Sequence, residues 1–168
     1  MLYTTNTQDA FRGRTAHIEY DNAIQYAGTL RPLEEGETRV DILPGMVVKH
    51  LGNKVMDVYD GTGTPFGLAS IFVAPGFGKG GLNQLGMNDE FTAIVGTNNT
   101  TVRIDKEALD PDASFVLDET GKAVPLYANA DGRITSTAGA PTEVIGNLLE
   151  VGEDGSIVIQ LKAPEVVA

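Results

Sequence analysis

The sequence predicts a mainly β protein, a compact β-barrel or β-sandwich domain with few short helices and an extended N-terminal arm. From Val40 onward, short apolar runs rich in β-branched residues are separated by Gly, Pro, Asn and Asp. These turn signals recur about every 10 residues, a spacing typical of sandwiches and barrels. Segments with helical periodicity are few and short.

The arm is expected over residues 1–28 and the β-rich domain over residues 29–168. The first segment is rich in Thr, Asn, Gln and Arg, and its scattered aromatic and aliphatic residues follow neither the period of a strand nor that of a helix for long. We therefore expect an extended segment that does not pack as a regular element. Its aromatic residues either dock on a partner or lie back on their own domain, and the sequence leaves both alternatives open.

Strands are expected wherever an apolar run lies between turn signals. The pairs Gly52-Asn53, Asp131-Gly132 and Asp154-Gly155 suit the backbone conformations of tight turns. The expected strands, in order, are Met46–Leu51, Lys54–Tyr59, Phe66–Val73, Glu90–Val95, Thr100–Ile104, Ser114–Leu117, Ala123–Tyr127, Arg133–Thr135, Val144–Val151 and Ser156–Leu161.

Helical turns are expected at two places only. One is near Gly81–Met87, and the other is at Asp105–Leu109, where Asp105 is a candidate N-cap and Pro111 ends the turn. Neither segment is long enough to carry a core.

The composition argues against several classes of function. The net charge is −11, with all of the excess acid in residues 34–168, and an acidic surface repels nucleic acid phosphates. The absence of cysteine excludes disulfides, thiolate metal sites and a cysteine nucleophile. The first residues have neither a basic start nor an apolar run, and no long apolar segment follows. We therefore expect a soluble protein without a signal peptide, a membrane partner or a direct nucleic acid partner.

The motifs that carry chemistry are incomplete. The Gly-rich loop Ala74–Leu82 fails the phosphate-binding pattern because Gly80, and not Ser or Thr, follows Lys79. Asp110–Asp118 begins like a calcium loop, but Phe115 stands where that loop requires Gly. His17 and His50 lie in different segments, without the spacing of a metal site. We expect no catalytic residue, no cofactor and no metal site, although calcium on the acidic surface stays open.

The order of several short runs resembles that of a known family. Leu43-Pro-Gly-Met-Val-Val48 opens the β-domain after the polar arm, Thr64-Pro-Phe-Gly-Leu-Ala69 follows, and Val144-Ile-Gly-Asn-Leu-Leu149 leads into the hairpin at Asp154-Gly155. Over roughly residues 28–162, this layout resembles the head decoration, or capsid cement, proteins of tailed bacteriophages.

The resemblance implies a structural protein of the virion. Such proteins bind the outer surface of the expanded head, often as trimers, and stabilise it against internal DNA pressure. The implied partners are the major capsid protein and two further copies of this chain. Within the arm we expect capsid contacts at Tyr3, Phe11, Arg12, Arg14 and His17. A second contact, or a trimer contact, is expected at Phe77, Lys79 and Leu82.

Three alternatives remain. A tail-tube or baseplate β-protein shares the small acidic β-architecture and the mobile arm. A carbohydrate-binding module ordinarily displays an aromatic platform, which is hard to build without tryptophan. A small enzyme on a β-scaffold lacks support because the catalytic motifs are missing.

Overall fold

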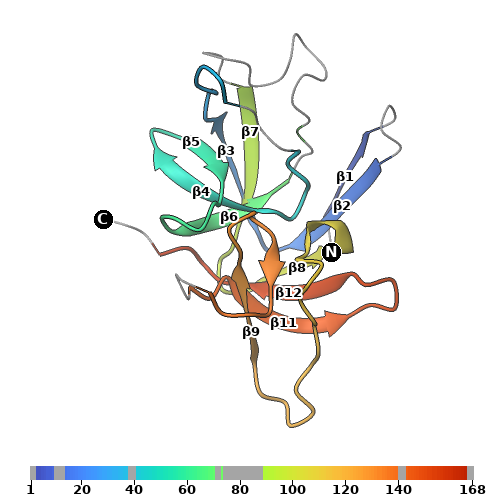
Figure 1. The fold of residues 1–168 in the computed structure, drawn as a ribbon. Coiled ribbons are helices and arrows are strands. Elements are labelled where there is room, and N and C mark those ends of the chain that lie inside the picture. Colours follow the sequence, from blue (N-terminus) through green and yellow to red (C-terminus); the bar gives the residue numbers. More distant parts are fainter. Residues whose placement is uncertain are drawn as a thin grey trace.

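A computed structural model describes residues 3–9, 14–37, 41–70, 73, 89–139 and 143–165, with side chains described from Ile18 onward except at residue 89. These residues form strands and one 3₁₀ turn (Figure 1). The elements are β1 (Tyr3–Asp9), β2 (Arg14–Asp21), β3 (Ile24–Leu30), β4 (Val47–Gly52), β5 (Val55–Val58), β6 (Pro65–Ala69), β7 (Asp89–Val95), β8 (Thr100–Ile104), η1 (Lys106–Ala108), β9 (Val124–Ala128), β10 (Ile134–Thr135), β11 (Gly146–Val151) and β12 (Ile157–Leu161).

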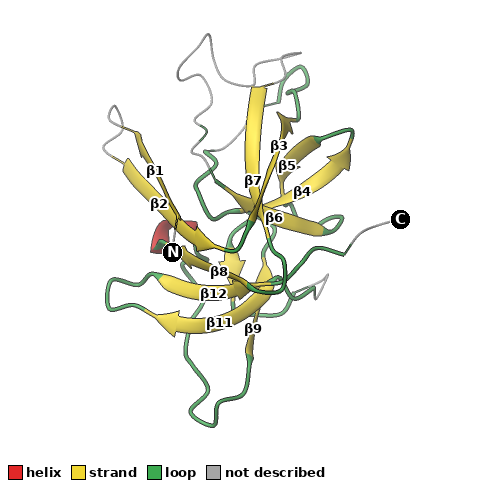
Figure 2. Cartoon of the chain, turned by 180° about the vertical axis from the view of Figure 1, so that it is seen from behind, coloured by secondary structure: helices red, strands yellow, loops and turns green. Residues whose placement is uncertain are grey.

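The strands form a closed barrel and a separate sheet. The barrel has the order β3-β5-β4-β6-β7, closed by pairing of β7 with β3, and only the β3–β5 pair is parallel. The seven-stranded sheet has the order β1-β2-β8-β12-β11-β9-β10. The chain starts in the sheet, crosses into the barrel at β3 and returns to the sheet at β8, so the barrel is an insertion into the sheet (Figure 2). The predicted mainly β class with a barrel is confirmed.

The barrel strands β4, β6 and β7 bury residues of both faces where they lie against the sheet. Val48 belongs to the cluster inside the barrel, whereas the preceding Val47 belongs to the larger cluster that includes the sheet. Val47 pairs with Leu68, and Leu68 pairs with Ile94, so these three residues form a row on the outer face of the barrel. That row packs in the same cluster as sheet residues such as Ile104. Burying each aliphatic side chain contributes about 1.5–3 kcal/mol, so this interface is a main source of stability.

The β4–β5 hairpin turns one residue later than predicted. Asn53 and Lys54 form the turn, with φ of 49° and 62°, while Gly52 ends β4 beside an irregularity in the register. Two consecutive positive φ angles are what a type I′ turn requires. The sequence pattern of Gly followed by Asn suggested the earlier position, but the bulge at His50/Gly52 moves the turn forward by one residue.

A close approach of backbones joins this hairpin to β3. The amide of Thr29 donates to the carbonyl of Lys54 at 2.9 Å. A Cβ on the neighbouring Gly28 would lie 2.1 Å from that carbonyl oxygen. The position therefore requires a glycine, because a methyl group there would push β3 away from the hairpin.

Most predicted strands are present within two or three residues of their predicted bounds, but Ser114–Leu117 is not a strand. It lies in the loop between η1 and β9, where Val116 and Leu117 are exposed. The apolar run alone favoured a strand, yet no neighbouring strand pairs with it in the described structure. The predicted turn at Asp105–Leu109 is present as η1, although the Asp105 side chain makes no capping hydrogen bond. The predicted turn at Gly81–Met87 lies outside the described residues.

The prediction that the N-terminal segment does not pack is wrong from Ile18 onward. Ile18 and Tyr20 belong to the larger core, and residues 18–21 of β2 pair with β8. β3 forms one wall of the barrel through its pairing with β7. The error arose because these strands alternate apolar residues with Glu, Gln and Thr over too short a distance to stand out. Whether residues 1–28 act as an arm that contacts a partner stays a prediction.

Candidate functional site

The predicted contact residues lie partly on the β1–β2 hairpin. Tyr3 pairs with Tyr20 near the sheet, His17 pairs with Asn6 in the middle, and Arg14 pairs with Asp9 at the far end. The hairpin therefore places Tyr3, His17 and Arg14 on one element but at increasing distances from the sheet. Phe11 and Arg12, and the second predicted group of Phe77, Lys79 and Leu82, lie outside the described residues.

The far half of this hairpin has no support from the sheet. Within the described residues, only Ile18–Asp21 of β2 pair with β8, and Arg14–His17 pair with β1 alone. In Figures 1 and 2, the hairpin projects from the sheet beside the barrel. Among the described residues, β1 has β2 as its sole partner strand, and it forms one edge of the sheet. An open edge presents unpaired backbone N–H and C=O groups to which another strand can add.

The base of the hairpin is held firmly. The hydroxyls of Thr97 and Thr100 donate to the carbonyl of Asn22, at 3.0 and 2.7 Å, at the link between β2 and β3. On the outer face of the sheet, Arg103 lies 3.6 Å from Glu19 of β2 and 3.7 Å from Glu150 of β11. These contacts and the buried Ile18 fix the direction in which the hairpin leaves the sheet.

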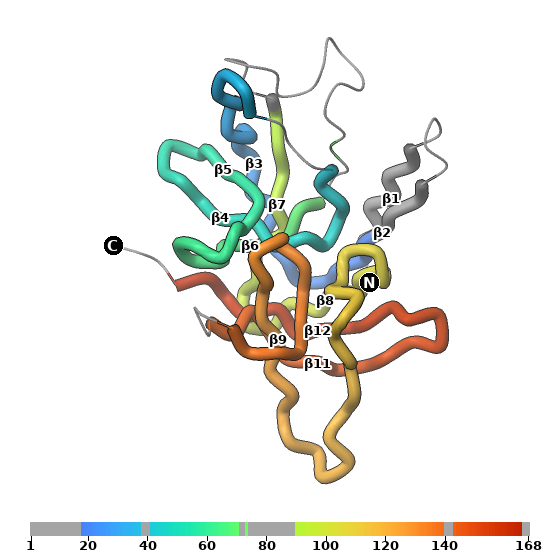
Figure 3. The backbone as a smooth tube through the Cα atoms, viewed as in Figure 1, coloured from blue at the N-terminus to red at the C-terminus, as the bar shows by residue number. Residues whose placement is uncertain are grey.

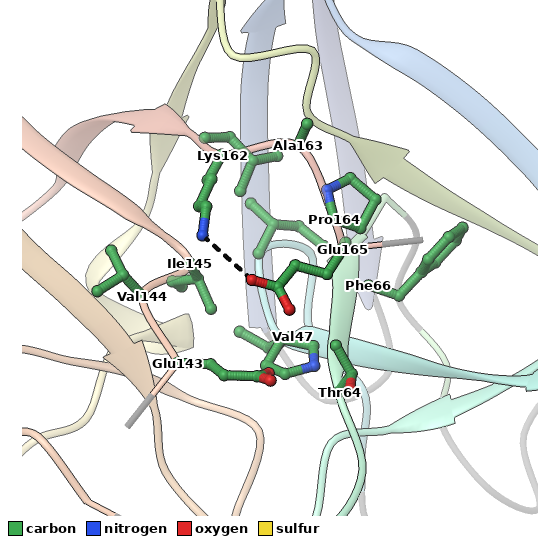
Figure 4. A pocket seen from close by; sticks show the side chains of 14 residues that line it. Val47, Thr64, Phe66, Glu143, Val144, Ile145, Lys162, Ala163, Pro164 and Glu165 are labelled. Atoms are coloured by element: carbon green, nitrogen blue, oxygen red, sulfur yellow. Dashed lines mark ion pairs between the residues drawn. The ribbon is translucent and has the colours of Figure 1, made fainter. Parts of the chain in front are cut away.

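A groove lies between the barrel and the C-terminal segment (Figure 4). Its volume is about 320 Å³, with β6 and Phe66 on one side and the segments 143–145 and 162–165 on the other. The Nζ of Lys162 lies 3.8 Å from Glu165 Oε1, and Glu143 lies across the groove. Burial raises the pKa of the neighbouring Tyr59, and the charges of Glu143 and Asp60 raise it further. An apolar groove bordered by two carboxylates suits an apolar or cationic side chain.

An aromatic cluster closes the barrel beside this groove. The rings of Tyr26, His50 and Phe66 lie 5.0 to 5.4 Å apart. The Gly52 amide donates to His50 Nδ1 at 3.1 Å, so the neutral ring carries its proton on Nε2, which lies 2.9 Å from the Tyr26 hydroxyl. His50 is therefore engaged in packing and hydrogen bonding within the barrel wall.

Ion pairs reinforce the barrel on two sides. Arg31 donates to Asp57 at 2.6 Å and holds Glu37 with two parallel hydrogen bonds, at 2.9 and 2.7 Å. Hydrogen bonds to Glu37 and Asp57 raise the pKa of Arg31. Lys49 Nζ lies 2.7 Å from Asp60 Oδ1. Burial alone would raise the pKa of Asp60, but hydrogen bonds from Lys49 and Thr62 outweigh it and lower the pKa to about 2.

Asp110, at the start of the calcium-like segment, and Asp154 both accept hydrogen bonds within their own turns. Asp110 accepts a hydrogen bond from the amide of Asp112 at 3.0 Å, and Asp154 accepts from the amide and hydroxyl of Ser156. In the described part of the chain, no group of three or more His, Asp and Glu side chains could hold a metal ion. No helix in that part is long and apolar enough to cross a membrane.

The comparisons with known proteins identify a family. A family model described as "phage cement protein" matches residues 3–168. No curated protein and no solved structure matched the chain. The family match spans the projecting hairpin, the barrel and the sheet alike, and it agrees with the resemblance drawn from the runs at Leu43, Thr64 and Val144. Proteins of this kind are structural components associated with a phage capsid. Because the family model covers nearly the whole chain, this chain belongs to the phage cement protein family.

Proposed function

We propose that this protein binds the exterior of an expanded bacteriophage head, contacts the major capsid protein through the β1–β2 hairpin, and acts as a homotrimer that stabilises the head against DNA pressure. The observation that carries the proposal is the projecting hairpin. Its base is fixed in the core, while its far half and the outer edge of β1 are free of partner strands among the described residues.

The chemistry of the hairpin suits strand addition to a partner. A lone two-stranded hairpin is only marginally stable in water, so a projecting one gains stability when a third strand joins it. In strand addition, backbone hydrogen bonds provide affinity, and alternate side chains provide specificity. β1 reads Tyr-Thr-Thr-Asn-Thr-Gln-Asp, a polar sequence that tolerates water before binding and has few apolar residues to promote aggregation.

A trimer would increase the strength of modest contacts. When one hairpin is bound, the other two act at high effective concentration, which raises avidity by about 10²–10⁴ without new contacts. The acidic body, with its net charge of −11, fits a position outside the shell, away from the packaged DNA. The alternative of a tail-tube or baseplate component has no observation in its favour beyond the shared β-architecture.

The direct test is co-sedimentation of the purified protein with expanded, undecorated heads. We expect saturable binding at a ratio fixed by the capsid lattice, and a trimer by analytical ultracentrifugation. Deleting residues 2–16 should abolish binding while circular dichroism remains that of a folded β-protein. Binding that survives this deletion would remove the hairpin from the proposal.

A proline scan of β1 tests strand addition itself. Along an edge strand, alternate amides face the neighbour within the sheet and the open side. Proline at Thr4, Thr5, Asn6 and Thr7 in turn should therefore have alternating effects: head binding is lost with the β1–β2 pairing intact by hydrogen exchange where the amide faces the open side, and the pairing itself is lost where the amide faces β2. A uniform effect would indicate that side chains, and not the open edge, make the contact.

A further inference from the structure

The loop from Asp110 to Ala123 is the longest connection that the structure describes completely. None of its residues belongs to a strand of the barrel or of the sheet. It joins η1 to β9 and extends away from the sheet, at the bottom of Figures 1 and 3. Every residue from Val116 to Ala123 is exposed. Loops longer than about 12–15 residues without secondary structure are uncommon in compact domains, and ordered ones usually have a function.

Local hydrogen bonds give this loop a defined shape. At its start, the Asp110 amide donates to the Ile134 carbonyl at 2.8 Å, and the Ala113 amide donates to the Asp110 carbonyl at 3.2 Å. At its tip, Asp118 accepts from the amide and hydroxyl of Thr120, and these bonds lower the pKa of Asp118. Gly121 closes the turn with a φ of 78°. A preformed loop loses little conformational entropy when it binds.

The loop presents two neighbouring aliphatic side chains to solvent. Phe115 packs against the larger core and anchors the loop, whereas the next two residues, Val116 and Leu117, are 67% and 45% exposed. Exposed aliphatic residues are ordinary on a protein surface, so what distinguishes this pair is its place on a shaped, projecting loop. Around the pair, Asp110, Asp112, Asp118 and Glu119 outnumber the single cation, Lys122.

We propose that this loop is a second capsid anchor: Val116 and Leu117 enter an apolar recess on a capsid subunit, and Lys or Arg side chains on its rim face the loop's acids. This inference rests on the proposed function. A second copy of this chain is the poorer occupant, because its own surface is acidic and would repel the loop.

The position of the loop indicates what the second anchor does. It lies at the opposite end of the molecule from the projecting end of the β1–β2 hairpin (Figures 1 and 2). Two anchors at opposite ends of one packed body reach different capsid subunits. A cement protein needs such a bridge, because holding two subunits together requires a contact with each of them.

The experiment compares matched pairs of exposed residues. V116S/L117S changes the loop, and L149S/V151S makes the same kind of change on β11, where Leu149 and Val151 are 46% and 40% exposed. Both proteins and the wild type are titrated onto expanded heads. We expect V116S/L117S to bind at least ten-fold more weakly and L149S/V151S to bind within about two-fold of the wild type, with folding and oligomeric state unchanged in both.

Charge is tested with a second pair. E119K alters the acidic rim of the loop, and E153K makes the same change in net charge at the exposed turn between β11 and β12. E119K should bind more weakly and lose part of its salt dependence, whereas E153K should not. Equal losses in both variants would show a general charge effect and contradict the basic rim.

The possible outcomes separate the inference from the proposed function. Wild-type affinity in V116S/L117S would overturn the second anchor while leaving capsid binding intact. A change of V116S/L117S to a smaller oligomer would also overturn it, in favour of a contact between copies of this chain. Failure of the wild-type protein to bind heads at all would instead overturn the proposed function.

Discussion

Two hairpins of this protein have similar backbones and different surroundings. The β4–β5 hairpin pairs with β6 on one side and with β3 on the other, and its Val48 and Met56 are fully buried in the barrel. The far half of the β1–β2 hairpin pairs only with itself. The strands of the first contain four valines, and the strands of the second contain four threonines. The comparison teaches that one hairpin is built into the core of the fold, while the far half of the other projects from the sheet.

Two N-terminal deletions of different length should show the largest difference between the two hairpins. Deleting residues 2–28 removes β2 and most of β3, which opens the barrel and takes Ile18 and Tyr20 from the core. That protein should not fold. Deleting residues 2–16 removes the edge strand β1 and the end of β2 beyond the sheet but keeps Ile18–Asp21 paired with β8, so thermal unfolding should stay cooperative. Loss of folding in the shorter deletion would mean that β1 supports the core after all.

Phe91→Ala should produce the largest effect of any single substitution proposed for the barrel. Phe91 is 1% exposed and lies inside the barrel with Leu30 and Met56. Truncating a buried phenylalanine leaves a cavity and costs about 3–5 kcal/mol. His17→Ala on the projecting half of the β1–β2 hairpin is the matched ring truncation and should leave the free energy of unfolding within about 0.5 kcal/mol. Urea denaturation of both variants measures the contrast.

Gly28→Ala should lower the free energy of unfolding by a smaller amount, because a methyl group does not fit between β3 and the β4–β5 hairpin. The new Cβ would lie 2.1 Å from the Lys54 carbonyl oxygen and 3.0 Å from Met56 Cε, so β3 must move away from the β4–β5 hairpin. Overpacking of this kind costs roughly 1–3 kcal/mol. Gly139→Ala is the control, because its Cβ meets nothing within 4 Å. Equal stability of both variants would contradict the close approach of these backbones.

The smallest effect concerns the ion pair beside the β4–β5 hairpin. The pKa of Asp60 is lowered to about 2, so its contribution to stability is complete above the unfolded value near 4 and is lost as the pH falls toward 2. Because Asp60 is largely exposed, the contribution should be at most about 1 kcal/mol. Asp60→Asn should therefore differ from the wild type at pH 6 and differ less at pH 3. A constant difference would indicate that the amide disturbs the turn and that the charge is not the cause.

Several features were predictable from local sequence because their causes are local. The hairpin at Asp154-Gly155 and the turn at Asp131-Gly132 follow from residues that accept positive φ or accept backbone hydrogen bonds. The strand at Thr100–Ile104 alternates apolar and polar residues, and it was placed at its observed bounds. The three buried residues of this strand, Thr100, Val102 and Ile104, all fall on one face.

Other features could not be read locally. Val116 and Leu117 have the apolar character of a strand but lie exposed on a loop, because no strand that the structure describes pairs with them. Ile18 and Tyr20 sit in a polar segment, yet they are buried because β8 lies beside them. The projecting hairpin was missed as a hairpin for the same reason: pairing is a property of two segments, and one segment alone does not reveal it.

The sequence by itself determined that this protein is built of short strands joined by tight turns, that its surface is acidic, and that its runs resemble those of cement proteins. Only the tertiary structure decided how the strands divide between barrel and sheet. Alternation along a strand indicates which residues are buried, but it does not indicate which element they pack against. The neighbours Val47 and Val48, for example, belong to different hydrophobic clusters. The physical reason is that the hydrophobic effect is non-directional, so the element against which each apolar face packs is decided by the fold of the whole chain.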